Sequence, residues 1–563
     1  MKTGLVFSLS LISTLTATAR ATVSWDQVRA KFGDSASQGR PYSKPCYDSW
    51  NSSECVSIRD NYLLAAPRTT NAGARIQTQW ETCHTTGEQC LLDFTNPNNR
   101  GAVDSSRCAL GSVPKYFIDV RNHKQVQEAF HFSRNTGIPI VIDNTGHDYK
   151  GRSSGPGTLA LWTHNLQDIS LDDAFVAEGC PASYQAVTMG AGVQFSKLYA
   201  FAEANNVTVV GGSDASVGAS GGWLMGGGHG ALSNTLGLGV DRVLQFKIVT
   251  PDGKYRTANA CQNKDLFFAL RGGGGGTFGV VLETTIKASP QVTLQAVFLT
   301  FSGTIEHTKE LWSVMIDNGL KWAEEGWGGY STFGAFIYIT PLLTPCEADE
   351  SMKPIAQLGE RLKAQGATNV SLVQAQFDSW LQWYSVFSKA NKAMSGVSLP
   401  LASRLINKGS FKTEESREAL LEALVAAYHV TPRMILLATA PASFAGDGQT
   451  SVTEAWRDSI YHITAVSSWQ WNATKVDKLA GYKRVSQSID NLRKITPDAA
   501  YSNECDVYEP NHEETLWGSN YRKLLAVKRK YDPDHLLDCW HCVGWDKNSP
   551  RFRCYFSEEE LQA

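Results

Sequence analysis

Alternation of apolar and polar positions divides the chain into regions of different predicted structure. Apolar residues recur at helical spacing over 126–133, Gly137 supplies a C-cap, and the apolar run 138–142 predicts a strand. A second helix, capped by Ser196, leads into a predicted strand at 207–210. This part of the chain therefore begins with repeated helix-then-strand units.

The same patterns predict elements further along the chain. They are a hairpin over 244–255, strands at 296–301 and 335–339, helices at 311–322 and 415–429, and a last helix over 517–525 that stops at Asp532-Pro533. Helices and strands are thus mixed, which predicts an α+β protein.

Changes of pattern predict five parts. They are a signal peptide (1–21), a cysteine-rich N-terminal extension (22–109) that we expect to be loop-rich, a cofactor domain (110–290), a substrate domain with an antiparallel sheet covered by helices (291–495), and a C-terminal segment that returns to the cofactor domain (496–563).

Composition narrows the class of protein. With 563 residues, 42% apolar and 19% charged, the chain is ordinary for a folded protein. A formal net charge of −3 offers no basic face for nucleic acid. Beyond the apolar N-terminal leader, which resembles a cleaved secretory signal, no run approaches the ~20 apolar residues of a membrane span. We therefore expect a secreted, extracellular enzyme without a membrane anchor.

The twelve cysteines all follow the predicted cleavage point, so an oxidising compartment predicts a disulfide framework. The pairing stays open, although proximity makes Cys46–Cys55 and Cys83–Cys90 plausible. The pair Cys539 and Cys542 could be half a zinc site, but no second such pair accompanies it, and we predict no metal. Sequons for N-linked glycans begin at Asn51, Asn206, Asn369 and Asn472.

Two loops carry the candidate chemistry. The first, 144–151, presents His147 among small residues directly after a predicted strand. The second, 211–230, is too rich in glycine for the interior of a helix or strand. Bare backbone lets N–H groups approach a polyanion closely, so two such loops predict one extended, phosphate-bearing cofactor.

Three simpler interpretations fit less well. A Rossmann fingerprint needs a helix after its glycine loop, and none is predicted here. The phosphate-binding G-x-x-x-x-G-K-S/T loop does not occur. Residues 218–222 satisfy the G-x-S-x-G pattern of hydrolases, but Gly221 and Gly222 would break the helix that must follow the serine.

Taken together, the motifs resemble a known family. G-H-x-x-x-G after a strand, the segment V-G-x-S-G-G-W-L-M-G-G-G-H-G, and Y-x-N-x-x-D before N-Y-x-x-L are similar to FAD-linked oxidases of the vanillyl-alcohol-oxidase (PCMH) type, in particular the berberine-bridge-enzyme-like branch. The match covers about 110–290 and 495–545, and the segment 456–459 is similar to secreted fungal members. The resemblance implies a two-part PCMH-type FAD domain with a second α+β substrate domain.

The resemblance also implies roles for individual residues. His147 matches the histidine joined to the flavin, and Val281 is placed to meet the adenine side. Residues 214–216 stand where many members have a cysteine that makes a second covalent link, so we expect FAD attached through His147 only. The other implied cofactor contacts are Asn144, Thr145, Gly146, Asp148, Gly218, Gly221, Gly222, Gly226, Gly227, Gly228, Ser233, Gly237, Asp241 and Asn520.

Moving a hydride from a carbinol carbon to the flavin requires a positioned base for the hydroxyl proton. Tyr501 is the first candidate for base or orienting group, with Asn503 holding it. Tyr461 and His462 are the next candidates for this role. Because adjacent residues of a strand face opposite sides, we expect at most one of them to reach the substrate. His229 reads as an ordinary loop residue.

Valine at position 217, where the family has a residue governing oxygen access, suggests an oxidase. The expected partners are therefore a small-molecule substrate with an alcohol group and O2, with H2O2 as product. Alternatives are an oligosaccharide or secondary-metabolite oxidase of the same family, and a flavin-binding glycoprotein without turnover.

Overall fold

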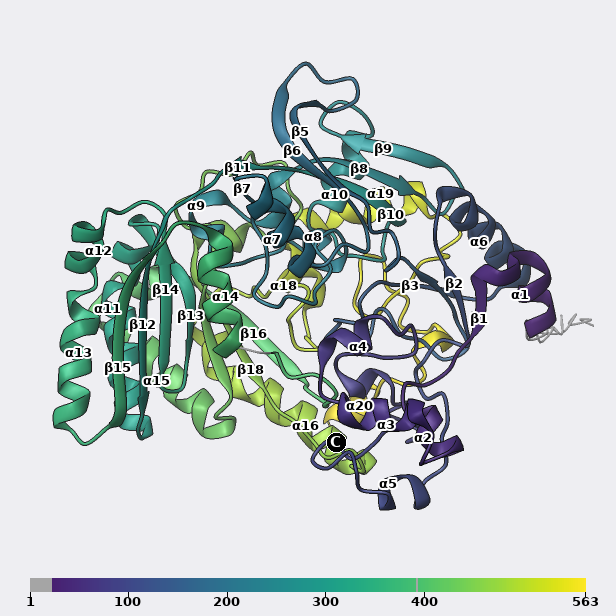
Figure 1. The fold of residues 1–563 in the computed structure, drawn as a ribbon, viewed down its shortest axis with the longest axis horizontal. Helices are drawn as coiled ribbons and strands as arrows, with labels where there is room; N and C mark the ends of the chain where they lie inside the picture. The colour runs from purple at the N-terminus through teal and green to yellow at the C-terminus, as the bar shows by residue number, and fades with distance from the viewer. Residues whose placement is uncertain (1–22, 391–392, 563) are drawn as a thin grey trace, which may run out of the picture.

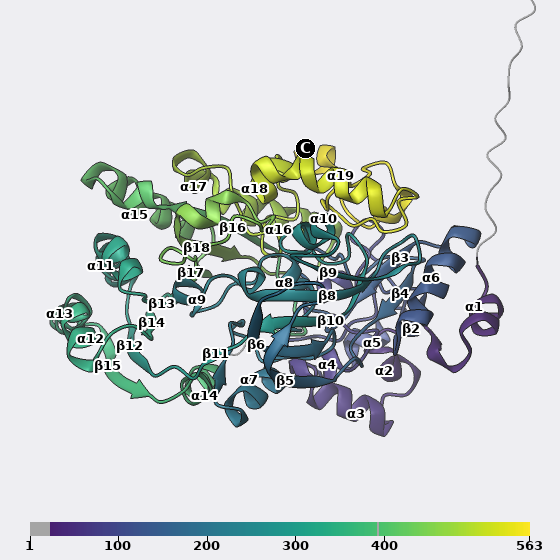
Figure 2. The same cartoon turned by 90° about the horizontal axis from the view of Figure 1, so that it is seen from above.

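The computed structural model describes residues 23–390 and 393–562, and the predicted signal peptide lies outside these ranges. The chain has the α+β fold expected from the sequence, with mixed helices and largely antiparallel sheets. Figures 1 and 2 show a seven-stranded sheet with its helices at one end of the molecule and the two smaller sheets that carry the glycine-rich loops towards the other.

The first small sheet has the order β1-β2-β4-β3, with β2, β4 and β3 parallel and β1 antiparallel to β2. Its strands are β1 (Ala36–Gln38), β2 (Tyr116–Asp119), β3 (Ile140–Asp143) and β4 (Leu159–Trp162). The predicted helix is α6 (His123–Thr136), which ends at the left-handed Gly137 and leads into β3. The first helix-then-strand unit is confirmed.

The second sheet has the order β5-β6-β10-β8-β9, and all its neighbours are antiparallel. Its strands are β5 (Ile169–Val176), β6 (Ser183–Gly190), β8 (Val243–Val249), β9 (Tyr255–Asn259) and β10 (Val280–Lys287), and α10 (Lys264–Leu270) follows β9. β8 and β9 form the predicted hairpin, with Val249 opposite Tyr255.

The cap predicted for the second helix is wrong. α7 (Phe195–Ala204) begins two residues earlier than a cap at Ser196 requires; its N-cap is Gln194, and Ser196 lies inside the first turn. Instead, the backbone N–H groups of Phe195 and Ser196 donate to the carbonyls of Val217 and Ala215. The first turn of α7 is thus satisfied by the glycine-rich segment, which it holds in place. The following strand is short: β7 (Val207–Thr208) pairs with β11 (Ser289–Pro290).

The seven-stranded sheet has the order β15-β12-β14-β13-β17-β18-β16, antiparallel throughout. Its strands are β12 (Leu294–Ser302), β13 (Gly328–Thr332), β14 (Ala335–Thr340), β15 (Thr368–Phe377), β16 (Leu401–Asn407), β17 (Met434–Ala438) and β18 (Ser459–Val466). Alternate residues face two different cores: Phe336 and Tyr338 pack under helices, whereas Ile337 and Ile339 join the core of the glycine-loop region.

Helices cover the face of this sheet that lies away from the glycine-rich loops (Figure 2). Those associated with the sheet are α11 (Ile305–Glu324), α12 (Pro345–Ser351), α13 (Lys353–Ala364), α15 (Glu414–Val430), α16 (Lys475–Ser488) and α17 (Asp490–Ile495). α14 (Trp380–Ala390) packs instead against α7, so its aromatic residues belong to the shared core.

The N-terminal extension is more helical than we expected. It contains α1 (Trp25–Phe32), α2 (Lys44–Asp48), α3 (Ser53–Asp60), α4 (Ala65–Thr69) and α5 (Gly101–Asp104). These helices have four to eight residues, too few turns for a clear apolar period. β1 from the same extension pairs with β2, so the extension contributes to the first sheet.

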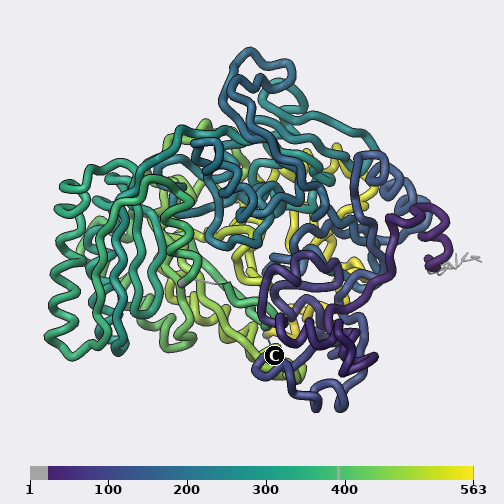
Figure 3. Tube along the Cα trace, viewed as in Figure 1, coloured from purple at the N-terminus to yellow at the C-terminus, as the bar shows by residue number. Residues whose placement is uncertain are grey.

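The predicted last helix is split in two: α18 (His512–Trp517) ends at Gly518, and α19 (Tyr521–Tyr531) stops before Asp532-Pro533 as predicted. α20 (Glu558–Gln562) follows. In Figure 3 the yellow C-terminal segment runs back among the blue segments of the glycine-loop region, where α19 contacts α10. A disulfide between Cys83 and Cys554 joins the C-terminal segment to the N-terminal extension.

Five disulfides form, and they correct part of the sequence prediction. Cys46–Cys55 is confirmed, but Cys83 bonds to Cys554 and Cys90 to Cys108 rather than to each other. The others are Cys180–Cys261 and Cys539–Cys542, the latter excluding a thiolate zinc site. Cys346 and Cys505 are free, so the framework does not use all twelve cysteines. Among the described residues, no helix is long and apolar enough to cross a bilayer.

Candidate cofactor and substrate site

A cavity of about 770 Å³ lies where the glycine-rich loops meet. The residues that the sequence singled out for the cofactor and that line the cavity are Asn144, Thr145, Gly146, His147, Asp148, Gly218, Gly221, Gly222 and Val281. The structure therefore brings together residues from three separate segments.

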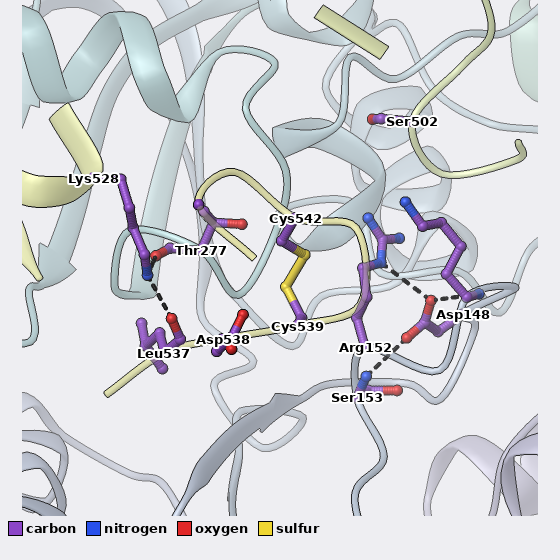
Figure 4. The surroundings of a disulfide bond; sticks show 12 residues. Asp148, Arg152, Ser153, Thr277, Ser502, Lys528, Leu537, Asp538, Cys539 and Cys542 are labelled. Carbon is purple, nitrogen blue, oxygen red and sulfur yellow. Dashed lines mark hydrogen bonds and ion pairs between the residues drawn. A yellow bond between two sulfur atoms is a disulfide. The ribbon is translucent and has the colours of Figure 1, made fainter. Parts of the chain in front are cut away.

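The first loop follows β3 and is fixed by Asp148. One carboxylate oxygen accepts from the backbone N–H of Lys150 at 3.0 Å and from Arg152 at 3.3 Å, and the other accepts from the N–H of Ser153 at 2.8 Å (Figure 4). Gly146 has a φ of +76°, which favours glycine. Asp148 thus shapes the loop, and its carboxylate is already occupied.

His147 lies on the cavity wall with 11% of its side chain exposed. Its Nε2 is 2.7 Å from the Ser216 hydroxyl, which is 2.6 Å from a carboxylate oxygen of Asp214. Burial lowers the pKa of His147, and the nearby Asp214 opposes this effect. The imidazole is therefore held by a residue pair from the second loop.

The second loop passes closely over the first. A Cβ added at Gly218 or Gly221 would lie 3.0 Å or 2.7 Å from Nδ2 of Asn144, which donates to the carbonyl of Ala191. After this crossing the chain forms the short helices α8 (Gly222–Met225) and α9 (Ser233–Leu236). The short α8 corrects the expectation that no helix follows the loop.

Seven predicted cofactor residues do not line the cavity; they support its walls. Gly226, Gly227 and Gly228 pack against the side chains of Asn503, Val452 and Trp223, respectively. The others have structural partners: Ser233 accepts from the N–H of Gly230, Gly237 packs on Phe444, Asp241 forms a double ion pair with Arg457, and Asn520 donates to the carbonyl of Val452.

The site list drawn from the sequence missed a third loop. Gly275, Gly276 and Gly279 line the cavity, and a Cβ at Gly275 would lie 2.9 Å from Cα of Gly222. The run of glycines at 272–276 was a visible signal of this close approach. The cavity is completed by Ile142, Arg152, Ser153, Thr163, Ala191, Val217, Trp223 and Met225.

Tyr501 and Asn503 lie behind the second loop. The Tyr501 hydroxyl donates to the carbonyl of Trp223 at 3.2 Å and accepts from the N–H of Gly228 at 3.3 Å and from Asn503 at 2.6 Å. Asn503 in turn accepts from Arg152, a cavity residue. Burial, with the nearby Glu504 carboxylate, raises the pKa of Tyr501. The hydroxyl is therefore fully engaged in holding the loop.

Of the two reserve candidates, the structure turns Tyr461 away from the site. Its hydroxyl donates to the carbonyl of Met315 in α11, within the core beneath the helices. His462, the next residue on β18, faces the other way and contacts Tyr501, with ring centroids 5.7 Å apart. The expectation that at most one of the two faces the site agrees with this arrangement.

His462 belongs to a buried cluster that the sequence did not predict. Glu504 lies 3.5 Å from Nε2 of His229 and 3.6 Å from Nδ1 of His462. Burial raises the pKa of Glu504, but His229 and His462 outweigh it, so the pKa lies below its usual value. Burial lowers the pKa of His462 to about 3. The carboxylate is thus ionised beside a neutral imidazole.

The cluster resembles a metal site in composition, since its ligand atoms lie within 4.8 Å of one another. A metal-bound histidine normally donates its second N–H to a fixed partner. Within the described chain, Nδ1 of His229 and both nitrogens of His462 are buried without a hydrogen-bond partner. The second-nitrogen partners that metal-bound histidines normally have are therefore missing from this cluster.

The lining of the main cavity fits a dinucleotide with a fused ring. Bare backbone at Gly146, Gly218 and Gly275 permits close approach of phosphates. Val217 and Met225 supply apolar contact for a ring, and His147 places an imidazole against the same space. Fold and site together define a flavoprotein of the FAD-linked class.

Comparison with known proteins agrees with this class. Residues 114–259 match the family model of an FAD binding domain, and residues 500–539 match the berberine and berberine-like model. The chain is 36% identical to the FAD-linked oxidoreductase ffsJ of Aspergillus flavipes, covering 90% of this chain and 89% of that protein. It is 35% identical to cheF of Chaetomium globosum, covering 94% and 88%. The chain belongs to the FAD-linked oxidoreductases with a berberine-like segment.

Solved structures share the fold. A VAO-type flavoprotein of Myceliophthora thermophila C1 aligns with a TM-score of 0.81 at 24% identity, covering 94% of this chain and 96% of that one. A glucooligosaccharide oxidase of Acremonium strictum aligns with a TM-score of 0.62 at 19% identity, covering 77% and 91%. The resemblance stated from sequence is therefore confirmed for the family and the fold.

Proposed function

We propose that this protein is a secreted oxidase that takes a hydride from an alcohol-type substrate to FAD and passes the electrons to O2, giving H2O2. The observation that carries the proposal is the position of His147, on the wall of a cavity built from three glycine-rich loops. FAD supplies the two-electron acceptor in this chemistry. The protein supplies binding, orientation and a place for the substrate proton.

We further propose that FAD is attached through His147 only. A related glucooligosaccharide oxidase is described as carrying a 6-S-cysteinyl, 8α-N1-histidyl FAD. In this chain Asp214, Ala215 and Ser216 stand where the resemblance places the cysteine of such a double link. The free cysteines do not line the cavity: Cys346 is exposed and Cys505 is buried elsewhere. A single tether follows.

For the proton, Glu504 is better placed than Tyr501. Glu504 lies beside two buried histidines that have nitrogens without hydrogen-bond partners. The Tyr501 hydroxyl, in contrast, already makes three hydrogen bonds, to Trp223, Gly228 and Asn503. The two histidine rings pack against Tyr501, whose hydroxyl donates to the carbonyl of Trp223, a residue that lines the cavity. Tyr501 and Asn503 would keep the second loop in position.

The substrate alternatives of the sequence stay open. Two structural neighbours are named as a glucooligosaccharide oxidase and a chitooligosaccharide oxidase, which supports an oligosaccharide as the second candidate. A secondary metabolite is the third candidate. A flavin-binding glycoprotein without turnover is the contrasting class, and the same experiment separates all of them.

The experiment has two stages. Acid precipitation of the purified protein should leave yellow flavin in the pellet, and His147→Ala should release it. Anaerobic mixing with primary aliphatic alcohols, benzylic alcohols, mono- to tetrasaccharides and hydroxylated secondary metabolites such as polyketides and alkaloids should then bleach the flavin with one class. A colourless protein contradicts the flavin proposal, and bleaching by none of the panel leaves the binding protein.

Secretion and glycosylation are part of the proposal. Five disulfides are typical of an oxidising compartment. The four sequon asparagines, Asn51, Asn206, Asn369 and Asn472, are all exposed. We expect the mature protein to begin near Thr22 and to lose mass on treatment with an endoglycosidase. N-terminal sequencing and mass spectrometry measure both.

A further inference from the structure

Ser216 and Asp214 form a short polar chain behind His147. The Asp214 carboxylate accepts from both the backbone N–H of Ser216 at 2.8 Å and the Ser216 hydroxyl at 2.6 Å. The carbonyl of Ser216 accepts from Gln194 at 2.5 Å. Hydrogen bonds therefore hold Ser216 on both sides, and Nε2 of His147 lies 2.7 Å from the Ser216 hydroxyl oxygen.

This network assigns the protons. The Ser216 hydroxyl donates its one proton to the Asp214 carboxylate, so the hydroxyl oxygen accepts the N–H of His147 Nε2. The lone pair of the neutral imidazole is then on Nδ1. In the described part of the chain Nδ1 has no hydrogen-bond partner, and His147 lines the cavity. The nucleophilic nitrogen is thus left free.

Bond formation at Nδ1 creates a positive imidazolium unless the Nε2 proton leaves. Burial opposes that charge, as it lowers the pKa of His147. The Asp214 carboxylate can accept this proton through the Ser216 hydroxyl. At the positions where the family resemblance places a second, cysteinyl link, this chain has Asp214, Ala215 and Ser216.

We propose that Asp214, acting through Ser216, is the base that enables His147 to attach FAD to itself. This inference rests on the proposed tether. As the bond between Nδ1 and the flavin methyl carbon forms, the imidazole loses its Nε2 proton to Ser216 and Ser216 loses its own to Asp214. The C–H bond that breaks at the methyl carbon gives up one proton and two electrons. The two electrons and two protons released overall reduce O2 to H2O2.

Asp214 and Ser216 are positioning residues in this scheme, and the test follows attachment rather than turnover. Ser216→Ala and Asp214→Asn should bind FAD yet release most of it on acid precipitation. General-base assistance contributes ~10²–10⁴-fold, and the rate of attachment should fall within that range. Asparagine keeps an acceptor for the Ser216 N–H, so Asp214→Asn preserves the turn. Ser216→Thr keeps the hydroxyl, so it should attach FAD as the wild-type protein does, unlike Ser216→Ala.

A pH series separates a base from a merely structural role. Between pH 6 and 8 the attachment rate of Asp214→Asn should rise with pH, as hydroxide or buffer replaces the carboxylate, whereas the wild-type rate should change little. Ser170→Ala, on the exposed face of β5, is the matched control and should retain covalent FAD. Visible absorbance before precipitation reports bound FAD, and thermal unfolding reports the fold.

The outcomes distinguish this inference from the function on which it rests. If Ser216→Ala and Asp214→Asn attach FAD at the wild-type rate while His147→Ala releases it, the proton path is wrong and the tether stands. If His147→Ala keeps covalent flavin, the tether itself is wrong. If Asp214→Asn is slow but independent of pH, Asp214 is only structural.

Discussion

At the scale of single residues, function depends on which polar groups remain free after folding. Tyr501 satisfies a family-like motif, but its hydroxyl makes three hydrogen bonds to its own surroundings. Glu504, three positions along, matches no motif that we could read, yet it lies between two histidines whose nitrogens lack partners. The available groups, rather than the motif, indicate the chemistry.

Glu504→Gln should slow reduction of the flavin by the substrate ~10²–10⁴-fold, because glutamine keeps the shape and removes the proton acceptor. Covalent FAD should remain, since His147 and its partners are untouched. Anaerobic stopped-flow absorbance measures the rate. Glu418→Gln, exposed on α15, is the control. Equal rates in both variants would assign the proton to another group.

Tyr501→Phe should mainly cost stability. Removing the hydroxyl leaves the buried N–H of Gly228 without a partner, at about 1–3 kcal/mol, while the carbonyl of Trp223 keeps only its 3.5 Å bond from Asn503. Denaturant unfolding measures the loss, and we expect the rate of flavin reduction to fall less than tenfold. A loss of more than a hundredfold in that rate, with normal stability, would restore Tyr501 as the base.

At the scale of elements, the site depends on loops that cross with almost no space between them. The Asn144 side chain packs against Gly218 and Gly221, and the backbones of Gly275 and Gly222 are in close contact. The glycine-rich sequence indicates such crossings, but it does not say which loop meets which. The crossings therefore offer a direct test of the packing.

Gly221→Ala should destabilise the protein by ~1–3 kcal/mol and weaken FAD binding, because the new Cβ would lie 2.7 Å from Nδ2 of Asn144. That amide donates to Ala191 at 2.6 Å and cannot shift freely. Gly222→Ala is the matched control for stability, since no atom lies within 4 Å of its added Cβ. Thermal unfolding compares the two variants, and equal midpoints would show that the Asn144 side chain moves aside without cost.

Local patterns predicted much of the fold. α6 with its left-handed Gly137, β3 and the β8–β9 hairpin follow from residues close together in sequence. The cap at Ser196 failed because carbonyls of Val217 and Ala215 satisfy the helix instead. The same reason hid the contacts of His147 with Ser216: each depends on a second segment whose position only the folded chain fixes.

At the scale of the whole molecule, the ends of the chain are fastened together beside the substrate sheet. Cys83 bonds to Cys554, 471 positions away. Next to it, the buried His84 packs between Trp80, Tyr482 and Phe556, which come from the N-terminal extension, α16 and the C-terminal segment. One aromatic cluster thus connects three parts of the molecule and contains an ionisable ring.

His84 should make this junction sensitive to acid. Burial lowers the pKa of His84 to about 3; Lys478 adds to this effect, and the hydrogen bond to the carbonyl of Gln79 opposes it. Below pH 6.5 the unfolded chain gains a proton that the folded chain does not. Stability therefore falls by about 1.4 kcal/mol per pH unit, or roughly 2 kcal/mol between pH 6.5 and 5.0.

His84→Gln retains a donor for Gln79 without a group that titrates, so its unfolding free energy should fall less steeply over the same interval. Denaturant unfolding at several pH values measures the two slopes. His131→Gln, exposed on α6, should keep the wild-type slope. Other buried histidines such as His462 leave part of the dependence in every variant, so the difference between slopes, about one proton, is the quantity that decides. Identical slopes would mean that His84 is protonated in the folded protein or that water reaches the cluster.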